Sequence, residues 1–324
     1  MSSPKGKGTA RALGAFSGGL DGMLAARLLM EQGIEVHAVT FTSPFFSGES
    51  GMKAAEELGI PWRAVDFTEE IFALIKAPPS GFGKNMNPCI DCHAAMFAIL
   101  SRMAREEGFD FIFSGEVLGQ RPMSQNKGSL NRVRNLSETA GILLRPLSAL
   151  LMPPTPMEEN GLVDRERLLD LNGRGRTRQL ELAEKYGFSF VPSPAGGCLL
   201  TDPGYSRRLA VLRDLNLLTP DNALMVRFGR MFVLKGSIGL VGRTKDENRR
   251  IREAGKGCLV DIKGVPSPLG VLLGKADAIT MKTLAAIVAS FTKGSEPFTA
   301  VTSTGEFETR RMPIEEREAL RVIL

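Results

Sequence analysis

Residues 13–22 read Leu-Gly-Ala-Phe-Ser-Gly-Gly-Leu-Asp-Gly and connect a short apolar run to a helix-like apolar repeat. The run from Ala12 to Phe16 is typical of a buried parallel strand, and apolar residues recur at helical spacing from Met23 to Leu29. Residues 17–22 are therefore predicted to form the loop at a helix N-terminus. Unpaired backbone N–H groups and the helix dipole attract an anion there, and adjacent glycines let the backbone approach it closely. The stretch predicts a phosphate-binding loop.

Composition places the chain among ordinary water-soluble proteins. Its 324 residues are enough for two domains, and 43% are apolar while 24% are charged. No apolar run reaches the roughly 18 residues that a membrane span needs, so no membrane partner is expected. Residues 1–10 are basic but lack the apolar core of a secretory signal, and they are predicted to be a disordered tail of a cytoplasmic protein.

Four cysteines in a chain of this length do not indicate a disulfide scaffold, so metal or redox chemistry is considered first. Cys89 and Cys92 form a Cys-x-x-Cys turn just before a helix predicted over residues 94–107. Cys198 follows two glycines, and its thiolate can reach the same point if the fold brings the segments together. Three thiolates suit a [4Fe-4S] cluster with one open iron. Cys258 is interpreted as a lone, half-buried thiol.

Zinc is the alternative metal, and it would prefer a fourth protein ligand. His93 is the nearest candidate for that ligand. The interpretation that we favour for His93 is a residue in the first turn of a helix that faces water.

The loop Ser17-Gly18-Gly19-Leu20-Asp21 resembles the SGGxDS loop of the PP-loop ATP pyrophosphatases. Those enzymes split ATP between its α and β phosphates and adenylate a carbonyl oxygen. Gly22 stands where the family has serine, which removes one hydroxyl from the phosphate cradle. We expect weaker ATP binding or slower chemistry, with an inactive site as the alternative. The resemblance implies that Asp21 holds Mg²⁺ or orients the pyrophosphate.

A second segment, Ser114 to Gln125, is similar to the TGExxGQxxSQ segment of ThiI, although three residues rather than two separate Gln120 from Ser124. With the loop and the cysteines in the family's order, residues 10–205 resemble the tRNA thiolases of the ThiI and TtuA type. The resemblance implies an α/β fold with a doubly wound parallel sheet and ATP at the carboxyl ends of its strands. The ATP-binding residues that it implies are Phe16, Ser17, Gly18, Gly19, Asp21, Gly22, Thr40, Phe41, Gly115 and Gln120.

The implied reaction is ATP-dependent thiolation of a tRNA uridine. ATP would convert a uracil carbonyl oxygen to an adenylate, and sulfur from sulfide or a sulfur-donor protein would displace AMP. In the ThiI and TtuA type, Cys89, Cys92 and Cys198 would hold a cluster that presents the sulfur. In the related MnmA type, Cys89 or Cys92 would carry a persulfide or pair with Cys198. Asp21, Cys89 and Cys198 are therefore the predicted catalytic residues.

Two other functions stay open at this point. An amide-forming ATP pyrophosphatase would use the same loop but has no need of thiolates. A catalytically weakened RNA-binding protein would account for Gly22. The position and carbonyl that are thiolated, the sulfur donor and the oligomeric state are also open, with a homodimer as one alternative.

The chain is predicted to divide into a PP-loop domain over residues 11–205, a linker helix over 206–221 and a smaller α+β domain over 222–324. The last segment holds 17 Lys and Arg against 11 Asp and Glu, whereas the first 221 residues hold 24 against 25. Lys and Arg neutralise nucleic-acid phosphates, so this asymmetry indicates RNA binding. The turn that begins Gly242-Arg243 and ends Glu247-Asn248 resembles the NFACT RNA-binding domain.

The RNA-binding residues expected from these patterns lie in two basic groups. The first group precedes a helix that runs to Lys185, where three arginines oppose the helix dipole unless an anion offsets them. The second group belongs to the NFACT-like segment. Together they are Arg174, Arg176, Arg178, Arg243, Lys245, Arg249 and Arg250.

Overall fold

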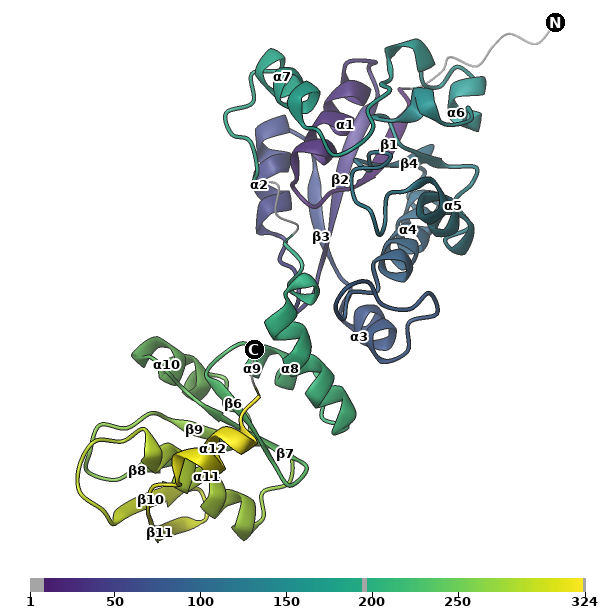
Figure 1. Ribbon diagram of the computed structural model, residues 1–324. Coiled ribbons are helices and arrows are strands. Elements are labelled where there is room, and N and C mark those ends of the chain that lie inside the picture. The colour runs from purple at the N-terminus through teal and green to yellow at the C-terminus, as the bar shows by residue number, and fades with distance from the viewer. Residues whose placement is uncertain (1–8, 194–196, 323–324) are drawn as a thin grey trace, which may run out of the picture. The chain divides into compact units, whose positions relative to one another are not determined.

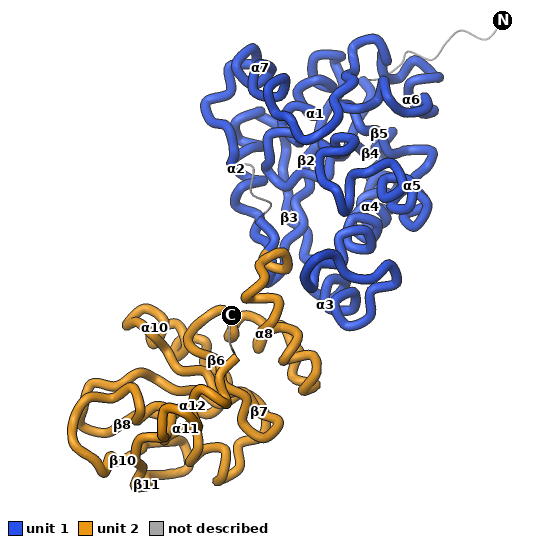
Figure 2. The backbone as a smooth tube through the Cα atoms, viewed as in Figure 1, with its two compact units in different colours: residues 1–198 blue, residues 199–324 orange. Residues whose placement is uncertain are grey.

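The computed structural model describes residues 9–193 and 197–322. Residues 1–8 of the predicted tail, Gly196 of the turn before Cys198, and the last two residues of the chain lie outside the described residues. The chain forms two compact units, residues 1–198 and 199–324 (Figure 2). None of the described helices has the length and apolar character needed to cross a membrane.

The first unit is built on a five-stranded parallel sheet with strand order β3-β2-β1-β4-β5. This confirms the predicted doubly wound α/β architecture. The apolar run that begins at Ala12 lies in the central strand. Helices cover both faces of this strand, which is why its residues are apolar without alternation. The strands are β1 (Arg11–Ala15), β2 (Glu35–Thr42), β3 (Trp62–Asp66), β4 (Phe111–Ser114) and β5 (Leu143–Leu144).

Helices cover both faces of this sheet (Figure 1). On one face α1 (Leu20–Met30) packs against α2 (Glu49–Leu58) and α7 (Thr177–Lys185). On the other face α4 (Cys89–Glu106) packs between α3 (Thr68–Lys76) and α5 (Lys127–Leu136). The short helix α6 (Pro156–Glu159) follows β5. Buried side chains of α1, β1 and β4 form the centre of the core.

The second unit is a six-stranded antiparallel sheet with strand order β11-β10-β8-β9-β7-β6, and α11 (Ala278–Ser290) packs on one face. This confirms the predicted α+β class. The strands are β6 (Arg230–Leu234), β7 (Ser237–Val241), β8 (Cys258–Ile262), β9 (Gly270–Leu273), β10 (Phe298–Thr302) and β11 (Gly305–Thr309). The remaining helices are α8 (Pro203–Asp214), α9 (Pro220–Met225), α10 (Lys245–Glu253) and α12 (Ile314–Leu320).

The structure differs from the sequence prediction in the segment that was expected to be a linker helix, residues 206–221. Two helices, α8 and α9, cover this region, and both belong to the second unit, which begins at Leu199. The hydroxyl of Tyr205 donates to the carbonyl of Ala223 (2.8 Å), and Arg208 donates to the carbonyl of Val226 (2.7 Å). These buried contacts tie α8 to α9, which spacing along the chain could not indicate.

Candidate active site

The predicted phosphate loop lies at the topological switch point of the parallel sheet. Strand β1 has β2 on one side and β4 on the other, so the chain winds in opposite directions from it. In such sheets ligands bind outside the carboxyl ends of the strands at this point. Ala15 at the end of β1 lies opposite Ser114 at the end of β4, so the loops that follow are neighbours. A Cβ atom at Gly115 would overlap the backbone of Asp21 and Gly22.

The loop itself is held from the side of β2 and α2. Gly18 has a φ of +79°, and a Cβ atom there would overlap the backbone of Ser50 at the start of α2. The buried hydroxyl of Thr40 donates to the carbonyl of Phe16 (2.5 Å) and accepts from the indole N–H of Trp62 (2.8 Å). Because both hydrogen-bonding capacities of Thr40 are used, it positions the loop.

The other predicted nucleotide contacts differ in exposure. Phe41 is buried and packs edge-on against Phe67, while Ser17 is exposed in the loop. Gly19 caps α1 with no side-chain hydrogen bond, so no side chain competes with an anion at that helix end. The geometry therefore leaves the loop backbone and the hydroxyl of Ser17 to face a nucleotide.

Asp21 is the chemically distinctive group of the loop. Burial raises its pKa above the usual value, against the lowering effects of a hydrogen bond from Gln120 and of the charges on Arg176 and Arg121. Within the described residues, Oδ1 of Asp21 and Oε1 of Gln120 are buried and have no hydrogen-bond partner. Two hard oxygen acceptors left without partners are the ligand type that Mg²⁺ prefers. The donor set at this point fits a magnesium ion.

The groups that affect the pKa of Asp21 come from three segments that are far apart in the sequence. Arg121 follows β4 and Arg176 precedes α7, and both lie close enough to Asp21 to affect its pKa electrostatically. Gln179 on α7 is buried and hydrogen-bonds Asp21. The sequence patterns predicted Arg176 as an RNA-binding residue and assigned no role to Arg121 or Gln179. Two cations beside a phosphate loop can neutralise an anionic leaving group.

The three cysteines of the predicted cluster site also come near one another. Cys89 and Cys92 are on the first turn of α4, which begins five residues earlier than predicted because Pro88 caps it. Burial raises the pKa of the Cys92 thiol well above its usual range, and the charges of Cys198 and Cys89 raise it further. These mutual effects indicate that the three cysteines lie in the same region of the first unit. The side-chain amide of Asn87 donates to Sγ of Cys89 (3.1 Å).

The three cysteines can be compared with the ligands that zinc and a [4Fe-4S] cluster each require. Within residues 9–193 and 197–322, no three His, Cys, Asp or Glu side chains are grouped so that they could hold one metal ion. His93, the candidate fourth ligand for zinc, bonds Oε1 of Glu116 through Nδ1 (3.0 Å) and is only partly exposed. It therefore neither faces water, as was expected, nor joins the cysteines. Zinc would need a fourth protein ligand beside the thiols, and the [4Fe-4S] cluster stays a prediction.

Glu116 connects the cysteine helix α4 to the segment that follows β5. Its carboxylate accepts from Nε of Arg145 (2.7 Å) and bonds His93, and both the Glu116 and Arg145 side chains are 6% exposed. Burial alone would raise the pKa of Glu116, but Arg145 and His93 outweigh it and lower the pKa to about 2. The pair ties α4 and the end of β4 to the segment after β5. No spacing rule pointed to Arg145, so the sequence missed this contact.

We expect Glu116→Gln to destabilise the protein by about 3–5 kcal/mol at pH 7, because it leaves the buried Arg145 charge without its counter-ion. Urea unfolding at pH 7 measures the change. Since the folded pKa is lowered, the stabilisation is full above the usual value of 4.5 and is lost as the pH falls toward about 2. Glu116→Gln should flatten this acid dependence. A double variant with Arg145→Met should recover part of the loss, and equal stability of Glu116→Gln and wild type would contradict the assignment.

The structure separates the first group of predicted RNA-binding arginines. Helix α7 begins at Thr177, so Arg174 and Arg176 precede it, and only Arg176 lies near Asp21. Arg178 is exposed and forms an ion pair with Asp170 (2.7 Å). Arg174 is exposed. The three side chains therefore do not act as one cluster, and their role in RNA binding stays a prediction.

The NFACT-like turn in the second unit is held by contacts among its own motif residues. A Cβ atom at Gly242 would overlap the side chain of Asn248, whose Oδ1 accepts from the amide of Leu269 (3.1 Å). Glu247 accepts from the backbone N–H of Arg243 (2.7 Å) and forms an ion pair with its guanidinium. Glycine, glutamate and asparagine of the motif thus hold the turn. The guanidinium of Arg243 is itself held by Glu247 through Nε and Nη2, so its role in RNA binding stays a prediction.

The remaining predicted RNA-binding residues are on α10. Arg249 forms ion pairs with Asp246 (2.6 Å) and Glu253 (3.2 Å), and Arg250 forms one with Asp246 (2.7 Å). Lys245 is exposed at the start of the helix. The positive charge of α10 is therefore largely balanced within the helix itself.

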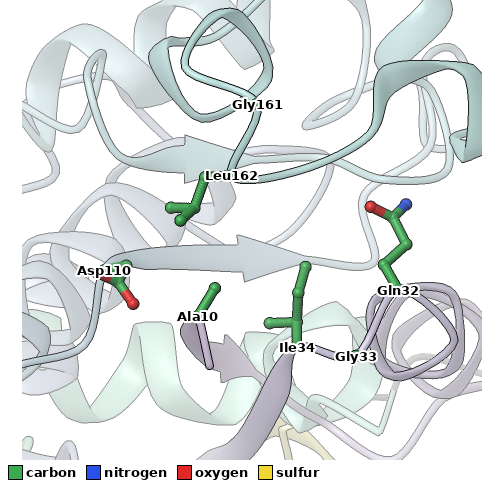
Figure 3. A pocket seen from close by; sticks show the side chains of 7 residues that line it. All are labelled: Ala10, Gln32, Gly33, Ile34, Asp110, Gly161 and Leu162. Carbon is green, nitrogen blue, oxygen red and sulfur yellow. The ribbon is translucent and has the colours of Figure 1, made fainter. Parts of the chain in front are cut away.

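A cavity of about 380 Å³ in the first unit lies away from this site (Figure 3). Ala10, Ile34 and Asp110 line it, and these residues directly precede β1, β2 and β4. The cavity is thus at the amino ends of the strands, the edge opposite the phosphate loop. Its position does not correspond to a nucleotide site in a sheet of this type.

Comparisons with known families match both units. The model of the family described as thiamine biosynthesis protein (ThiI) matches residues 7–150. The model of the NFACT protein RNA binding domain matches residues 229–317. The resemblances inferred from the sequence are therefore confirmed: residues 7–150 are similar to the ThiI family and residues 229–317 to the NFACT RNA binding domain.

The chain is also similar to individual proteins and to a solved structure. The tRNA-specific 2-thiouridylase MnmA of Syntrophotalea carbinolica is 35% identical over 115 residues, which are 31% of this chain and 33% of that protein. The MnmA of Methylobacterium nodulans is 25% identical over 321 residues, 91% of this chain and 78% of that protein. The first relatives are matched over only about a third of their length. A solved complex of a 4-thiouridine synthetase with RNA and bound ATP aligns with 21% identity and a TM-score of 0.37, covering 56% of this chain and 53% of that one.

Proposed function

We propose that this chain is an ATP-dependent tRNA sulfurtransferase that adenylates a uracil carbonyl and replaces its oxygen by sulfur. The observation that carries the proposal is the pair of unsatisfied buried oxygens, on Asp21 and Gln120, at the switch point beside the phosphate loop. The ThiI-type and NFACT-type domains support tRNA as the substrate. The name of the MnmA relatives supports thiolation as the reaction.

The residues of the first unit divide the adenylation step among them. The loop backbone at the N-terminus of α1 would bind the triphosphate, and Ser17 adds a hydroxyl donor. Asp21 and Gln120 would hold Mg²⁺, which neutralises charge on the phosphates when bound. Arg121 and Arg176 lie beside Asp21 and would stabilise the departing pyrophosphate. The uracil oxygen attacks the α phosphate, and the bond between the α and β phosphates breaks.

Sulfur transfer would take place near the three cysteines at the start of α4. Cys89, Cys92 and Cys198 would hold a [4Fe-4S] cluster, which when bound supplies a site from which sulfur is presented as a nucleophile. The Glu116 contacts to His93 and Arg145 would keep the first turn of α4 aligned with the loop after β4. Sulfur displaces AMP from the adenylated carbon, and the AMP leaves with the former carbonyl oxygen.

A persulfide route is the second candidate, and the surroundings of Cys89 favour it. The Cys89 sulfur accepts from the side-chain amide of Asn87 and is in the first turn of α4, so a hydrogen-bond donor stands beside it. In this route a persulfide-bearing donor protein transfers its outer sulfur to Cys89, and the outer sulfur of the Cys89 persulfide displaces AMP from the uridine. Cys198 then attacks the Cys89 sulfur, so that the thiouridine leaves as the Cys89–Cys198 disulfide closes. None of the four cysteines, all of which are described, forms a disulfide in this structure.

The test of the function uses the full chain, ATP, Mg²⁺, sulfide and unmodified tRNA. After digestion of the tRNA, the nucleosides are separated and identified by mass spectrometry, and the amounts of AMP and pyrophosphate formed are measured. We expect one thiouridine for each AMP released, with the mass spectrum and retention time distinguishing oxygen 2 from oxygen 4. Cleavage of ATP to AMP without a thionucleoside would contradict sulfur transfer and favour another ATP pyrophosphatase reaction.

We expect Gly22→Ser to lower the KM for ATP by up to about tenfold, because a hydroxyl bound to a charged phosphate adds one strong hydrogen bond. The side chain fits, since a Cβ at Gly22 would lie 3.5 Å from the Phe16 ring, an ordinary contact. Steady-state kinetics of AMP formation measure the change. Gly22→Ala is the matched control, because it fills the same space without a hydroxyl. An unchanged KM in Gly22→Ser would mean that the loop functions fully with glycine.

A further inference from the structure

A cavity of about 370 Å³ lies within the second unit, and four arginines from four separate elements line it. Arg208 is on α8, Arg230 begins β6, Arg243 precedes α10 and Arg321 follows α12. Glu318 is the acidic member of the lining residues. These elements are far apart in the sequence, so the fold itself gathers the four guanidinium groups around one space. A cavity lined by such an excess of positive charge attracts an anion.

Arg208 gives the cavity a fixed positive charge. It is buried and donates to the carbonyls of Val226 (2.7 Å) and Phe228 (3.2 Å) through Nη1 and of Gly229 (2.9 Å) through Nη2. It forms no ion pair with any residue that the structure describes. Three carbonyl dipoles hold the guanidinium in place without neutralising it. A buried charge of this kind is costly unless a counter-ion is near.

Arg230 is the second arginine without a carboxylate partner in the described part of the chain. Its guanidinium stacks on the ring of Phe291, 4.5 Å from the ring centre, and makes only a long contact to the carbonyl of Gly242 (3.5 Å). The other two arginines are paired at the edge of the cavity, Arg243 with Glu247 and Arg321 with Glu318 (3.0 Å). The set therefore carries more positive charge than its two carboxylates balance.

Electrostatic effects within the set agree with this arrangement. Burial lowers the pKa of Arg208, and the charge of Arg243 lowers it further. Burial also lowers the pKa of Arg230, with further lowering by Arg321 and Arg243. The guanidinium groups thus repel one another across the cavity. An anion among them would relieve the repulsion.

We propose that this cavity binds a phosphate group of the RNA substrate. The proposal deepens the proposed function and rests on it, because RNA is the phosphate-bearing partner expected for this unit. Guanidinium groups bind phosphate oxygens through paired N–H donors. Arg230, which has no carboxylate partner among the described residues, can contribute such a pair, and Arg321 and Arg243 add positive charge beside it. The described residues that line the cavity include no aromatic ring, so the site would recognise phosphate rather than a stacked base.

The cavity differs from the basic surface of α10 in how much of its positive charge is paired with carboxylates. Arg249 and Arg250 share Asp246, and Arg249 also contacts Glu253, so carboxylates on the same helix already balance their charges. A phosphate that approached α10 would have to compete with those carboxylates. In the cavity, Arg208 and Arg230 offer charge that no carboxylate of the described residues occupies. The cavity is therefore the stronger phosphate site of the unit.

The test measures binding of labelled tRNA to the full chain by fluorescence anisotropy over a range of salt concentrations. We expect Arg230→Gln and Arg321→Gln each to weaken binding roughly fivefold and to reduce the slope of log affinity against log salt by about one. Glu318→Gln should strengthen binding, because it removes the acidic group from the lining. Arg310→Gln is the matched control. It removes the same charge from an exposed arginine that does not line the cavity.

The source of the phosphate is distinguished by comparing tRNA that carries a 5′-phosphate with tRNA that carries a 5′-hydroxyl. If only the tRNA with a 5′-hydroxyl binds more weakly, the cavity binds the terminal phosphate. If both forms bind equally, it binds an internal phosphodiester. If wild type binds tRNA but both cavity variants bind as well as Arg310→Gln, the proposed site is wrong while the proposed function stands. Weakening by Glu318→Gln would likewise overturn it.

A second readout keeps the site testable if wild type binds no tRNA, a result that would contradict the proposed function. The full chain is titrated with inorganic phosphate while the NMR signals of arginine Nε–H groups are followed. Signals that disappear in Arg230→Gln and Arg321→Gln identify these two side chains. Phosphate-dependent shifts of both signals support a phosphate site in the cavity, and unchanged signals at saturating phosphate overturn it.

Discussion

Replacement of Asp21 by asparagine is expected to lower the rate of ATP cleavage by roughly 10²–10³-fold. The neutral amide keeps the shape of the side chain but removes the charge that would bind Mg²⁺ beside Gln120. Because Oδ1 of Asp21 has no protein partner in the described residues, the substitution breaks no contact there. The loss should appear in kcat of AMP formation and in Mg²⁺-dependent ATP binding measured by calorimetry.

The same variant should be more stable than wild type when no ATP is present. Burial raises the pKa of Asp21 in the folded protein above its usual value of 3.8. A raised pKa stabilises the fold only at low pH, where the group is protonated, and this contribution is lost as the pH rises. At pH 7 the buried carboxylate therefore costs stability, and asparagine removes that cost. A lower melting temperature together with lost activity would instead indicate a structural role for Asp21.

Replacement of Cys198 by alanine is expected to abolish cluster binding and thiouridine formation. The wild-type chain, purified and reconstituted without oxygen, should hold about four irons and four sulfides and absorb visible light broadly. Cys89→Ala and Cys92→Ala should lose the same signals, because each thiolate would hold a different iron. Iron and sulfide analysis and the visible spectrum measure the result independently of activity.

Cys258→Ala is the matched control for the cysteine variants, because Cys258 is also a half-buried thiol but lies on β8 of the second unit. It should retain the cluster and the activity. A colourless wild-type protein that still forms thiouridine would rule out the cluster and favour the persulfide route. In that case Cys198→Ala should trap the persulfide on Cys89, which mass spectrometry detects as one added sulfur. Retention of four irons by Cys198→Ala would remove Cys198 from the ligand set.

Local sequence was sufficient to predict the glycine-rich loop between β1 and α1 and the class of each unit. Gly18 and Gly19 identify a loop whose backbone must approach its neighbours, and the structure places Gly18 against α2 at a φ of +79°. The apolar run of β1 predicts a strand buried on both faces, as its central position in the sheet requires. The turn from Gly242 to Asn248 is equally local, because Glu247 and Asn248 bond within or next to it.

Only the tertiary structure decided which side chains meet across the chain. Arg121 and Arg176 come from different segments, yet both act on Asp21, since the switch point brings the loops after β1 and β4 together. The arginine cavity depends on the packing of α12 against β6 and on Arg208 of α8, which bonds the carbonyl of Gly229 just before β6. The spacing of residues 206–221, which include Arg208, predicted only a linker helix. Periodicity and motifs report contacts between near neighbours in the sequence. Pairing between distant segments depends on how buried surfaces fit, and that information is spread over the whole chain.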